Sequence, residues 1–197
     1  MHELFEKLLA IISNPRFLSG EAAGAETPFY ICPYAVADAE AMKEMVVQLT
    51  KKLAERNVNV LQIDVFGLMV ETLKANGDYD WTIEHEREKS FPELRGHLNG
   101  ILDTEYVIAP AIGNIVATVP NVPNRVVFLT NIGACYPVLH ASTLLENLAK
   151  IIPDTLLVLY FPGEYRQIVG VGASLSLFGC LPSDRHYRAF NIRELII

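Results

Sequence analysis

The sequence has few charged residues and no C-x-x-C pair of cysteines. Both shortages limit the classes of protein to which the chain can belong. Only 20% of its 197 residues are Asp, Glu, Lys or Arg, whereas 51% are hydrophobic, and its mean hydropathy is +0.25. Cys32, Cys135 and Cys180 lie far apart without a C-x-x-C pair. This spacing predicts reduced core thiols rather than a disulfide framework or a zinc site. The apolar surplus has to lie in a membrane span, a buried core or an interface.

A membrane span is the first explanation to test. Two charge-free runs, residues 106–124 and 126–145, are long enough to cross a bilayer core of about 30 Å. Prolines interrupt the first run, and the second contains the polar turn Thr130-Asn131, so neither predicts a continuous apolar helix. The N-terminus also lacks the order of a signal peptide. We therefore expect a cytoplasmic chain without direct membrane contact.

Motifs for phosphate and metal binding are missing as well. No glycine is followed by lysine, which excludes a P-loop, and Gly170-Val171-Gly172 lacks the third glycine of a dinucleotide fingerprint. His85-Glu86 begins like a zincin helix, but Lys89 stands where the second histidine would be. Asp78 and Asp80 flank a turn without the ligand ladder of a calcium loop. We expect no cofactor and no metal.

The charge balance is acidic, with 16 Lys and Arg against 23 Asp and Glu and a net charge of −7. A protein that binds the phosphate backbone by itself normally carries a basic face. The balance therefore argues against direct DNA binding by the isolated chain.

Hydrophobic periodicity predicts strands that alternate with helices. Residues 42–53 show the clearest helical spacing, between apolar runs at 29–32 and 58–65 that indicate strands of a βαβ unit. The nearly pure apolar runs at 126–129 and 156–161 are typical of parallel strands buried on both faces. The predicted fold is a single α/β domain over residues 1–197, with a Rossmann-like, open, mainly parallel sheet of about four to five strands flanked by helices.

Further elements follow from periodicity and from capping residues. We expect helices over 4–12, over 66–74, over 83–89 with Asp80 as its cap, over 93–119 with a break near Pro110, and over 138–152, and an edge strand at 187–192.

Ligands of an open parallel sheet bind beyond the carboxyl ends of its strands, so the polar residues there are candidates. The candidate site or interface residues are Tyr34, Asp64, Asn131, Tyr136, Glu164, Tyr165, Arg166, Tyr187 and Arg188. Tyrosine and arginine are enriched at interface hot spots, which favours a docking surface in the C-terminal quarter. Turns and helix caps call for the same residue types. A nucleotide-sensing or enzymatic site without a P-loop at these strand ends is the alternative.

Cys135 is the candidate nucleophile, because it follows the strand at 126–129 and His140 lies five residues further on. No orienting acid accompanies the pair, and a reactive thiol needs a lowered pKa. A packed thiol explains Cys135 better.

Taken together, several segments resemble one known family along almost the whole chain. These segments are FYICPY at 29–34, VFLTNIGACYP at 127–137, FPGEYR at 161–166, LFG at 177–179 and YRAFN at 187–191. Their order and spacing are similar to those of the BrxB family.

The resemblance implies a component of a BREX bacteriophage-exclusion system, encoded beside a PglZ-like phosphatase-like protein, a DNA adenine methyltransferase, a large ATPase and a Lon-like protease. It implies a non-enzymatic subunit or adaptor with no catalytic residues to assign. The expected partners are other BREX proteins, first of all the PglZ-like protein, and the remaining apolar surplus is expected to form that contact. The surplus is also compatible with a homo-oligomer.

Overall fold

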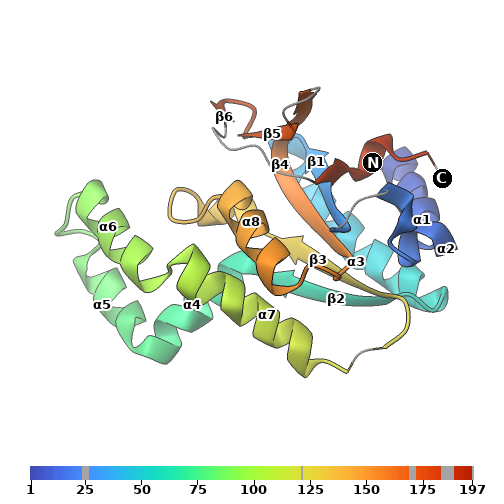
Figure 1. Ribbon diagram of the computed structural model, residues 1–197. Helices are drawn as coiled ribbons and strands as arrows, with labels where there is room; N and C mark the ends of the chain where they lie inside the picture. Colours follow the sequence, from blue (N-terminus) through green and yellow to red (C-terminus); the bar gives the residue numbers. More distant parts are fainter. Residues whose placement is uncertain (24–26, 121, 169–171, 183–188, 197) are drawn as a thin grey trace.

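The computed structural model describes residues 1–23, 27–120, 122–168, 172–182 and 189–196 (Figure 1). In these residues, five parallel strands form the main sheet in the order β2-β3-β4-β1-β7. The strands are β1 (Phe29–Tyr34), β2 (Asn59–Asp64), β3 (Arg125–Thr130), β4 (Leu157–Ile168) and β7 (Phe190–Asn191). The α/β class and the open, mainly parallel sheet predicted from the sequence are confirmed.

Helices cover both faces of this sheet (Figure 1). One face carries α4 (Val65–Asn76), α7 (Ala109–Thr118) and α8 (Ala141–Ile151), and the other carries α1 (His2–Ile12), α2 (Pro15–Leu18) and α3 (Ala39–Glu55). Two further helices, α5 (Asp78–His85) and α6 (Phe91–Ile101), extend away from the sheet beyond α4.

Successive strand residues point to opposite faces, so each central strand supplies two cores. On β1, Phe29 and Ile31 pack under α4, α7 and α8, whereas Tyr30 and Cys32 pack under α1 and α3. All four side chains are at most 1% exposed. Because helices cover both sides, the central strands need apolar residues at every position, which explains their nearly uninterrupted apolar runs.

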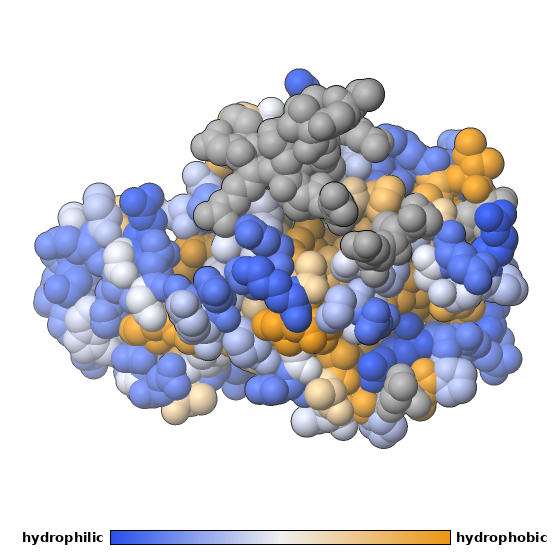
Figure 2. Space-filling view, in the orientation of Figure 1, coloured by the Kyte–Doolittle hydropathy of each residue, from blue (hydrophilic) through white to orange (hydrophobic). Residues whose placement is uncertain are grey.

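Both charge-free runs are folded into this architecture. Residues 106–124 include the end of a π-helical turn (Thr104–Ile108) and α7, and residues 126–145 pass through β3 and a 3-10 turn (Ile132–Cys135) into α8. Of the helices that the structure describes, none combines the length and the apolar character that a membrane span requires. Figure 2 shows apolar residues over the middle of one face and a largely hydrophilic end where α5 and α6 lie.

The fourth strand does not end at Phe161 as predicted. It continues to Ile168 and pairs with the antiparallel β5 (Gly172–Leu177), which pairs with β6 (Leu181–Pro182), so that a hairpin extends beyond the sheet (Figure 1). Gly163 allows this continuation, because a Cβ at its position would meet the Ser176 carbonyl oxygen and the Phe161 ring. The expectation that Glu164, Tyr165 and Arg166 lie beyond the strand end was wrong, because Gly163 serves close strand pairing instead of a turn.

Chain order differs from spatial order in the predicted βαβ unit. The strands β1 and β2 are both parallel members of the sheet, but β3 and β4 lie between them. Local hydrophobic spacing predicts the helix between two strands but carries no information on which strands become neighbours.

Two helix boundaries differ from the predictions because other residues supply the cap. The fifth helix begins at Asp78, directly after the left-handed Gly77, so Asp80 lies inside it. The helical region at 93–119 breaks near Asp103, whose Oδ1 accepts hydrogen bonds from the backbone N–H groups of Glu105 and Tyr106. Pro110 stands in the first turn of α7, where proline is tolerated.

Two further predictions concern the start of α8 and the C-terminal edge strand. The eighth helix begins at Ala141 rather than at residue 138, because the 3-10 turn and the segment after it occupy the preceding residues. The predicted edge strand is confirmed at Phe190–Asn191, where β7 pairs with β1.

Candidate functional site

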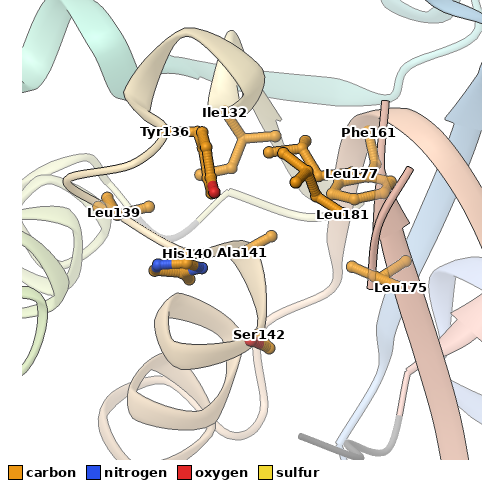
Figure 3. A pocket seen from close by; sticks show the side chains of 10 residues that line it. All are labelled: Ile132, Tyr136, Leu139, His140, Ala141, Ser142, Phe161, Leu175, Leu177 and Leu181. Atoms are coloured by element: carbon orange, nitrogen blue, oxygen red, sulfur yellow. The ribbon is translucent and has the colours of Figure 1, made fainter. Parts of the chain in front are cut away.

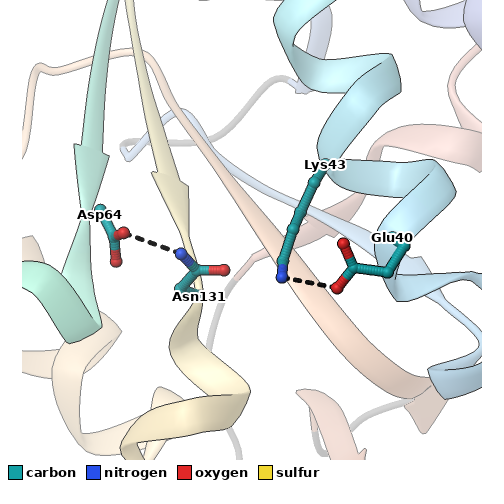
Figure 4. Close-up of polar contacts among 4 residues, drawn as sticks. All are labelled: Glu40, Lys43, Asp64 and Asn131. Atoms are coloured by element: carbon teal, nitrogen blue, oxygen red, sulfur yellow. Dashed lines mark hydrogen bonds and ion pairs between the residues drawn. The ribbon is translucent and has the colours of Figure 1, made fainter.

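Asp64 and Asn131 lie side by side where β2 and β3 end (Figure 4). Asn131 Nδ2 donates a hydrogen bond of 2.8 Å to Asp64 Oδ2, and the Gly67 backbone N–H donates one of 2.9 Å to Asp64 Oδ1. Asn131 has φ 60°, a left-handed conformation that asparagine adopts more readily than most residues. Asp64 therefore caps α4 and joins two neighbouring strand ends.

A wider crevice lies between the carboxyl end of β1 and the hairpin. We call it the strand-end crevice; its volume is about 540 Å³, and its lining includes Tyr34, Val36, residues 163–166, Phe178 and Arg193. The helix that follows β1 covers one face of the sheet, and the helices that follow β2 and β3 cover the other. The crevice therefore lies beside a topological switch point, where ligands of open α/β sheets bind.

The charged groups of the crevice already have partners. Arg166 Nη2 lies 2.8 Å from Glu164 Oε2, and Arg193 Nη1 donates a hydrogen bond of 3.1 Å to the Pro33 carbonyl oxygen. The Arg166 pair is exposed, like the Glu40–Lys43 pair along α3 in Figure 4, and exposed pairs contribute little to stability. Among the lining residues, the Glu164 carboxylate offsets the charge of Arg166 and leaves that of Arg193, so the crevice has a weak rather than a strong positive field.

Two tyrosines are also among the lining residues. Burial, with a smaller contribution from Cys32, raises the pKa of Tyr34 above its ordinary value. Burial and the nearby Glu194 raise the pKa of Tyr165, whose hydroxyl donates a hydrogen bond of 2.9 Å to the Ala189 carbonyl oxygen. Both hydroxyls therefore stay protonated at neutral pH, and the O–H of Tyr165 is already used in the bond to Ala189.

The other side of the hairpin bounds a separate apolar cavity (Figure 3). Its volume is about 140 Å³, and side chains line it from two directions. One wall comes from the 3-10 turn, the loop after it and the start of α8, and the other comes from β4, β5 and β6. We call it the apolar cavity; it is lined by Ile132, Tyr136, Leu139, His140, Ala141, Ser142, Phe161, Leu175, Leu177 and Leu181.

Strand alternation in the hairpin separates the two spaces. Tyr165 pairs with Leu175 and Gly163 pairs with Leu177, so the leucines share the face that turns toward the apolar cavity. Glu164 and Arg166 belong to the opposite face. The hairpin is therefore a shared wall with an apolar side and a polar side.

The structure supports the interpretation of Cys135 as a packed thiol. Its side chain is 2% exposed, and its Sγ donates a weak hydrogen bond of 3.5 Å to the Asn131 carbonyl oxygen. Burial, with a smaller contribution from Asp64, raises the pKa of the thiol to about 12. At neutral pH the thiol is protonated and does not act as a nucleophile.

In the native state, a thiol reagent is expected to label one of the three cysteines. Cys180 is exposed in the turn after β5, so the prediction of a core thiol was wrong at this position, whereas Cys32 and Cys135 are buried. A disulfide reagent should therefore label Cys180 quickly and the other two only after denaturation. Peptide mapping of the labelled protein measures this, and equally fast labelling of Cys135 would contradict its burial.

The structure brings the candidate residues together in three places. Tyr34, Glu164, Tyr165 and Arg166 line the strand-end crevice, Asp64 and Asn131 bond to each other, and Tyr136 lines the apolar cavity. Glu164, Tyr165 and Arg166 lie within β4 and not in a loop after it. Tyr187 and Arg188 lie outside the described residues.

Sequence reasoning missed Arg193 and the role of the hairpin leucines. Arg193 lies far along the chain from the strand end at Tyr34, and only the pairing of β7 with β1 carries it to Pro33. Leu175 and Leu177 alternate with serines, which is a usable sign of a strand with one apolar face. In the part of the chain that the structure describes, no cluster of three or more metal-ligating side chains is present.

Comparisons with known proteins identify similar sequences. A family model described as BREX protein BrxB matches residues 61–192. A BREX protein BrxB of Bacillus cereus (strain H3081.97) is 28% identical, over 98% of this chain and 97% of that protein. A BREX protein BrxB of Escherichia coli O9:H4 (strain HS) is 24% identical, over 92% of this chain and 86% of that protein. No solved structure shows significant similarity to the chain.

Proposed function

The chain belongs to the BrxB family, and from this premise we propose that it acts as a non-enzymatic adaptor subunit of a BREX phage-defence system. Membership makes it a BREX component, and the proposal concerns what that component does. Its task would be to hold other BREX proteins together through contacts at the strand-end crevice.

The composition of the crevice is the observation that carries this proposal. Tyrosine and arginine side chains line a concave surface of about 540 Å³ beside Phe178, which is 39% exposed. Such residues are enriched at hot spots, because each combines broad apolar contact with a hydrogen-bonding end. The Glu164 carboxylate offsets the charge of one of the two guanidinium groups, so the crevice lacks the concentrated positive charge that favours a polyphosphate, and a protein surface is the better ligand.

The PglZ-like protein is the partner that we place first. The family resemblance implies that such a protein is encoded in the same defence system, and an adaptor needs a stable complex with a neighbour. A second copy of this chain is the competing occupant of the crevice. Light scattering of the isolated chain separates this outcome from binding of the PglZ-like protein.

Replacement of Arg166 by alanine is expected to weaken a complex with the PglZ-like protein about 5- to 30-fold, the effect of losing a hot spot of about 1–2 kcal/mol. The Arg166 side chain is 76% exposed, so the fold should not change. Tyr165→Phe tests the neighbouring hydroxyl without removing the ring. Co-purification followed by calorimetric titration measures both effects.

Arg95→Ala is the matched control, because Arg95 is an exposed arginine on the projecting α6. It should bind as the unmodified chain does. Unchanged affinity in both Arg166→Ala and Tyr165→Phe would remove the crevice from the interface. Failure of the unmodified chains to form a complex would reject the PglZ-like protein as the partner.

The competing function is nucleotide sensing or catalysis in the same crevice. Its volume lies within the range of roughly 300–1,000 Å³ for small-molecule sites, and its location is the usual one. A nucleotide bound there would raise the melting temperature by mass action. A thermal-shift series with nucleotides and divalent metals is the direct comparison, and a saturable shift that Arg193→Ala removes would favour this function over the adaptor.

A further inference from the structure

The apolar cavity has the size of a single-ring site. Its volume is about 140 Å³, close to an engineered cavity of about 150 Å³, lined by Leu, Ile and Phe, that binds benzene. Pockets for drug-sized ligands are larger, roughly 300–1,000 Å³. Most of the lining is hydrocarbon, from Ile132 and Leu139 on one side to Phe161 and the hairpin leucines on the other.

Three of the lining side chains are polar, those of Tyr136, His140 and Ser142, and the first two carry aromatic rings. Tyr136 and His140 both line the cavity, and Figure 3 shows the Tyr136 hydroxyl directed into the space between the two walls. Their ring centroids are 5.4 Å apart at an interplanar angle of 81°, an edge-to-face contact that holds the Tyr136 ring in place. Neither ring donates a hydrogen bond to, or accepts one from, another residue in the described part of the chain.

We propose that the apolar cavity binds one aromatic ring that carries a hydroxyl or a similar hydrogen-bonding substituent, as a phenol does. The ring fits between Leu139 and the two hairpin leucines, where it contacts carbon on both faces. The substituent reaches Tyr136 and His140 at the edge. An apolar site with a few placed polar groups that fix orientation is the usual design of a small-ligand pocket.

The cavity is independent of the adaptor proposal. No described residue lines both the apolar cavity and the strand-end crevice. An experiment that rejects one of the two sites therefore does not reject the other.

Titration of the full-length chain with p-cresol and with toluene tests the proposal, with methyl NMR signals as the readout. We expect saturable p-cresol binding with a millimolar dissociation constant, an affinity that is ordinary for a ligand with so few heavy atoms. We also expect the methyl signals of Leu175 and Leu177 to change. The Tyr136→Phe variant should weaken p-cresol binding about 3- to 10-fold and leave toluene binding unchanged, because it removes one hydrogen bond and keeps the ring.

A variant that fills the cavity tests its position. Ala141→Leu at the start of α8 adds carbon to the lining and should weaken both ligands at least about tenfold, as expected when the bound ring loses its space. Ala75→Leu is the matched control, because Ala75 is exposed near the end of α4. Leu177→Phe replaces Ala141→Leu as the filling variant if the latter does not fold.

One further ligand distinguishes a ring that belongs to a partner protein from a ring that belongs to a free small molecule. Binding of N-acetyl-tyrosinamide as tight as that of p-cresol identifies a tyrosine side chain of a partner, and binding of p-cresol alone identifies a free small molecule. Absence of saturable binding, or binding that Ala141→Leu does not weaken, would overturn the proposed site. Equal affinity for cyclohexane and toluene would overturn its selectivity for an aromatic ring.

Discussion

Replacement of Gly163 by alanine is expected to lower the free energy of unfolding by about 1–3 kcal/mol, the usual cost of overpacking a filled site. The added Cβ would meet the Ser176 carbonyl oxygen, would approach Phe161 Cε1 to 2.8 Å and would lie 3.0 Å from the Phe178 backbone nitrogen. Two of these three neighbours are backbone atoms, which cannot move aside as the end of a flexible side chain can. The two hairpin strands therefore have to separate.

The same substitution should also weaken ligand binding in the apolar cavity. The hairpin holds Leu175 and Leu177 against the opposite wall, so separation of β4 from β5 displaces both leucines. We expect the affinity for p-cresol to fall at least as far as in the cavity-filling variant. Denaturant titration measures the stability, and NMR titration measures the affinity.

Gly96→Ala is the control for the glycine itself. Gly96 lies inside α6, and a Cβ there would meet nothing within 4 Å. Alanine should stabilise this helix by up to about 1 kcal/mol, because glycine is a poor helix former. The two substitutions therefore have opposite predicted signs, and a Gly163→Ala variant as stable as the original chain would show that the hairpin is looser at its base than the structure indicates.

Gly163 also shows where prediction from the sequence stops. Apolar runs predict the central strands well, because burial on both faces removes polar residues from every position. A Pro-Gly pair after such a run is typical of a turn, and only the pairing partner β5 reveals that the strand continues. The order of the strands in the sheet could not be predicted for the same reason, because strand neighbours depend on contacts between distant segments.

In the candidate site, too, residues at the ends of local elements could be predicted, whereas contacts between distant segments could not. Tyr34 and Asp64 could be predicted, because both stand at the end of a recognisable strand and polar strand ends meet at one edge of a parallel sheet. Arg193 could not, because β7, the strand before it, consists of only two residues. The apolar cavity could not be predicted either, since its two walls are distant in sequence and its shape depends on packing.

Two buried tyrosines lead to a prediction about alkaline pH. Tyr30 and Tyr160 are at most 2% exposed, and among the described residues their hydroxyls have no hydrogen-bond partner. Burial raises the pKa of Tyr30 to about 12 and that of Tyr160 well above its ordinary value. Burial also raises the pKa of the Cys32 and Cys135 thiols to about 12.

The raised pKa values make the folded state lose stability as the pH rises. In the unfolded chain these thiols and phenols ionise near pH 9 and pH 10, whereas in the folded chain they remain neutral to higher pH. Their contribution is therefore complete below about pH 9 and declines above it, by about 1.4 kcal/mol per group for each pH unit between the two pKa values. With several such groups, we expect cooperative unfolding in the alkaline range, which circular dichroism can follow.

Tyr160→Phe is expected to shift this alkaline transition to higher pH and to raise the free energy of unfolding at neutral pH by about 1–3 kcal/mol, the cost of a buried hydroxyl without a partner. The variant keeps the ring, which makes an edge contact with Phe128 at 5.2 Å. Tyr106→Phe is the matched control, because Tyr106 is 78% exposed and should change neither quantity. A loss of stability in Tyr160→Phe would contradict this prediction. It would mean that an internal water forms a hydrogen bond with the hydroxyl, because a buried hydroxyl stabilises the fold only when it has a hydrogen-bond partner.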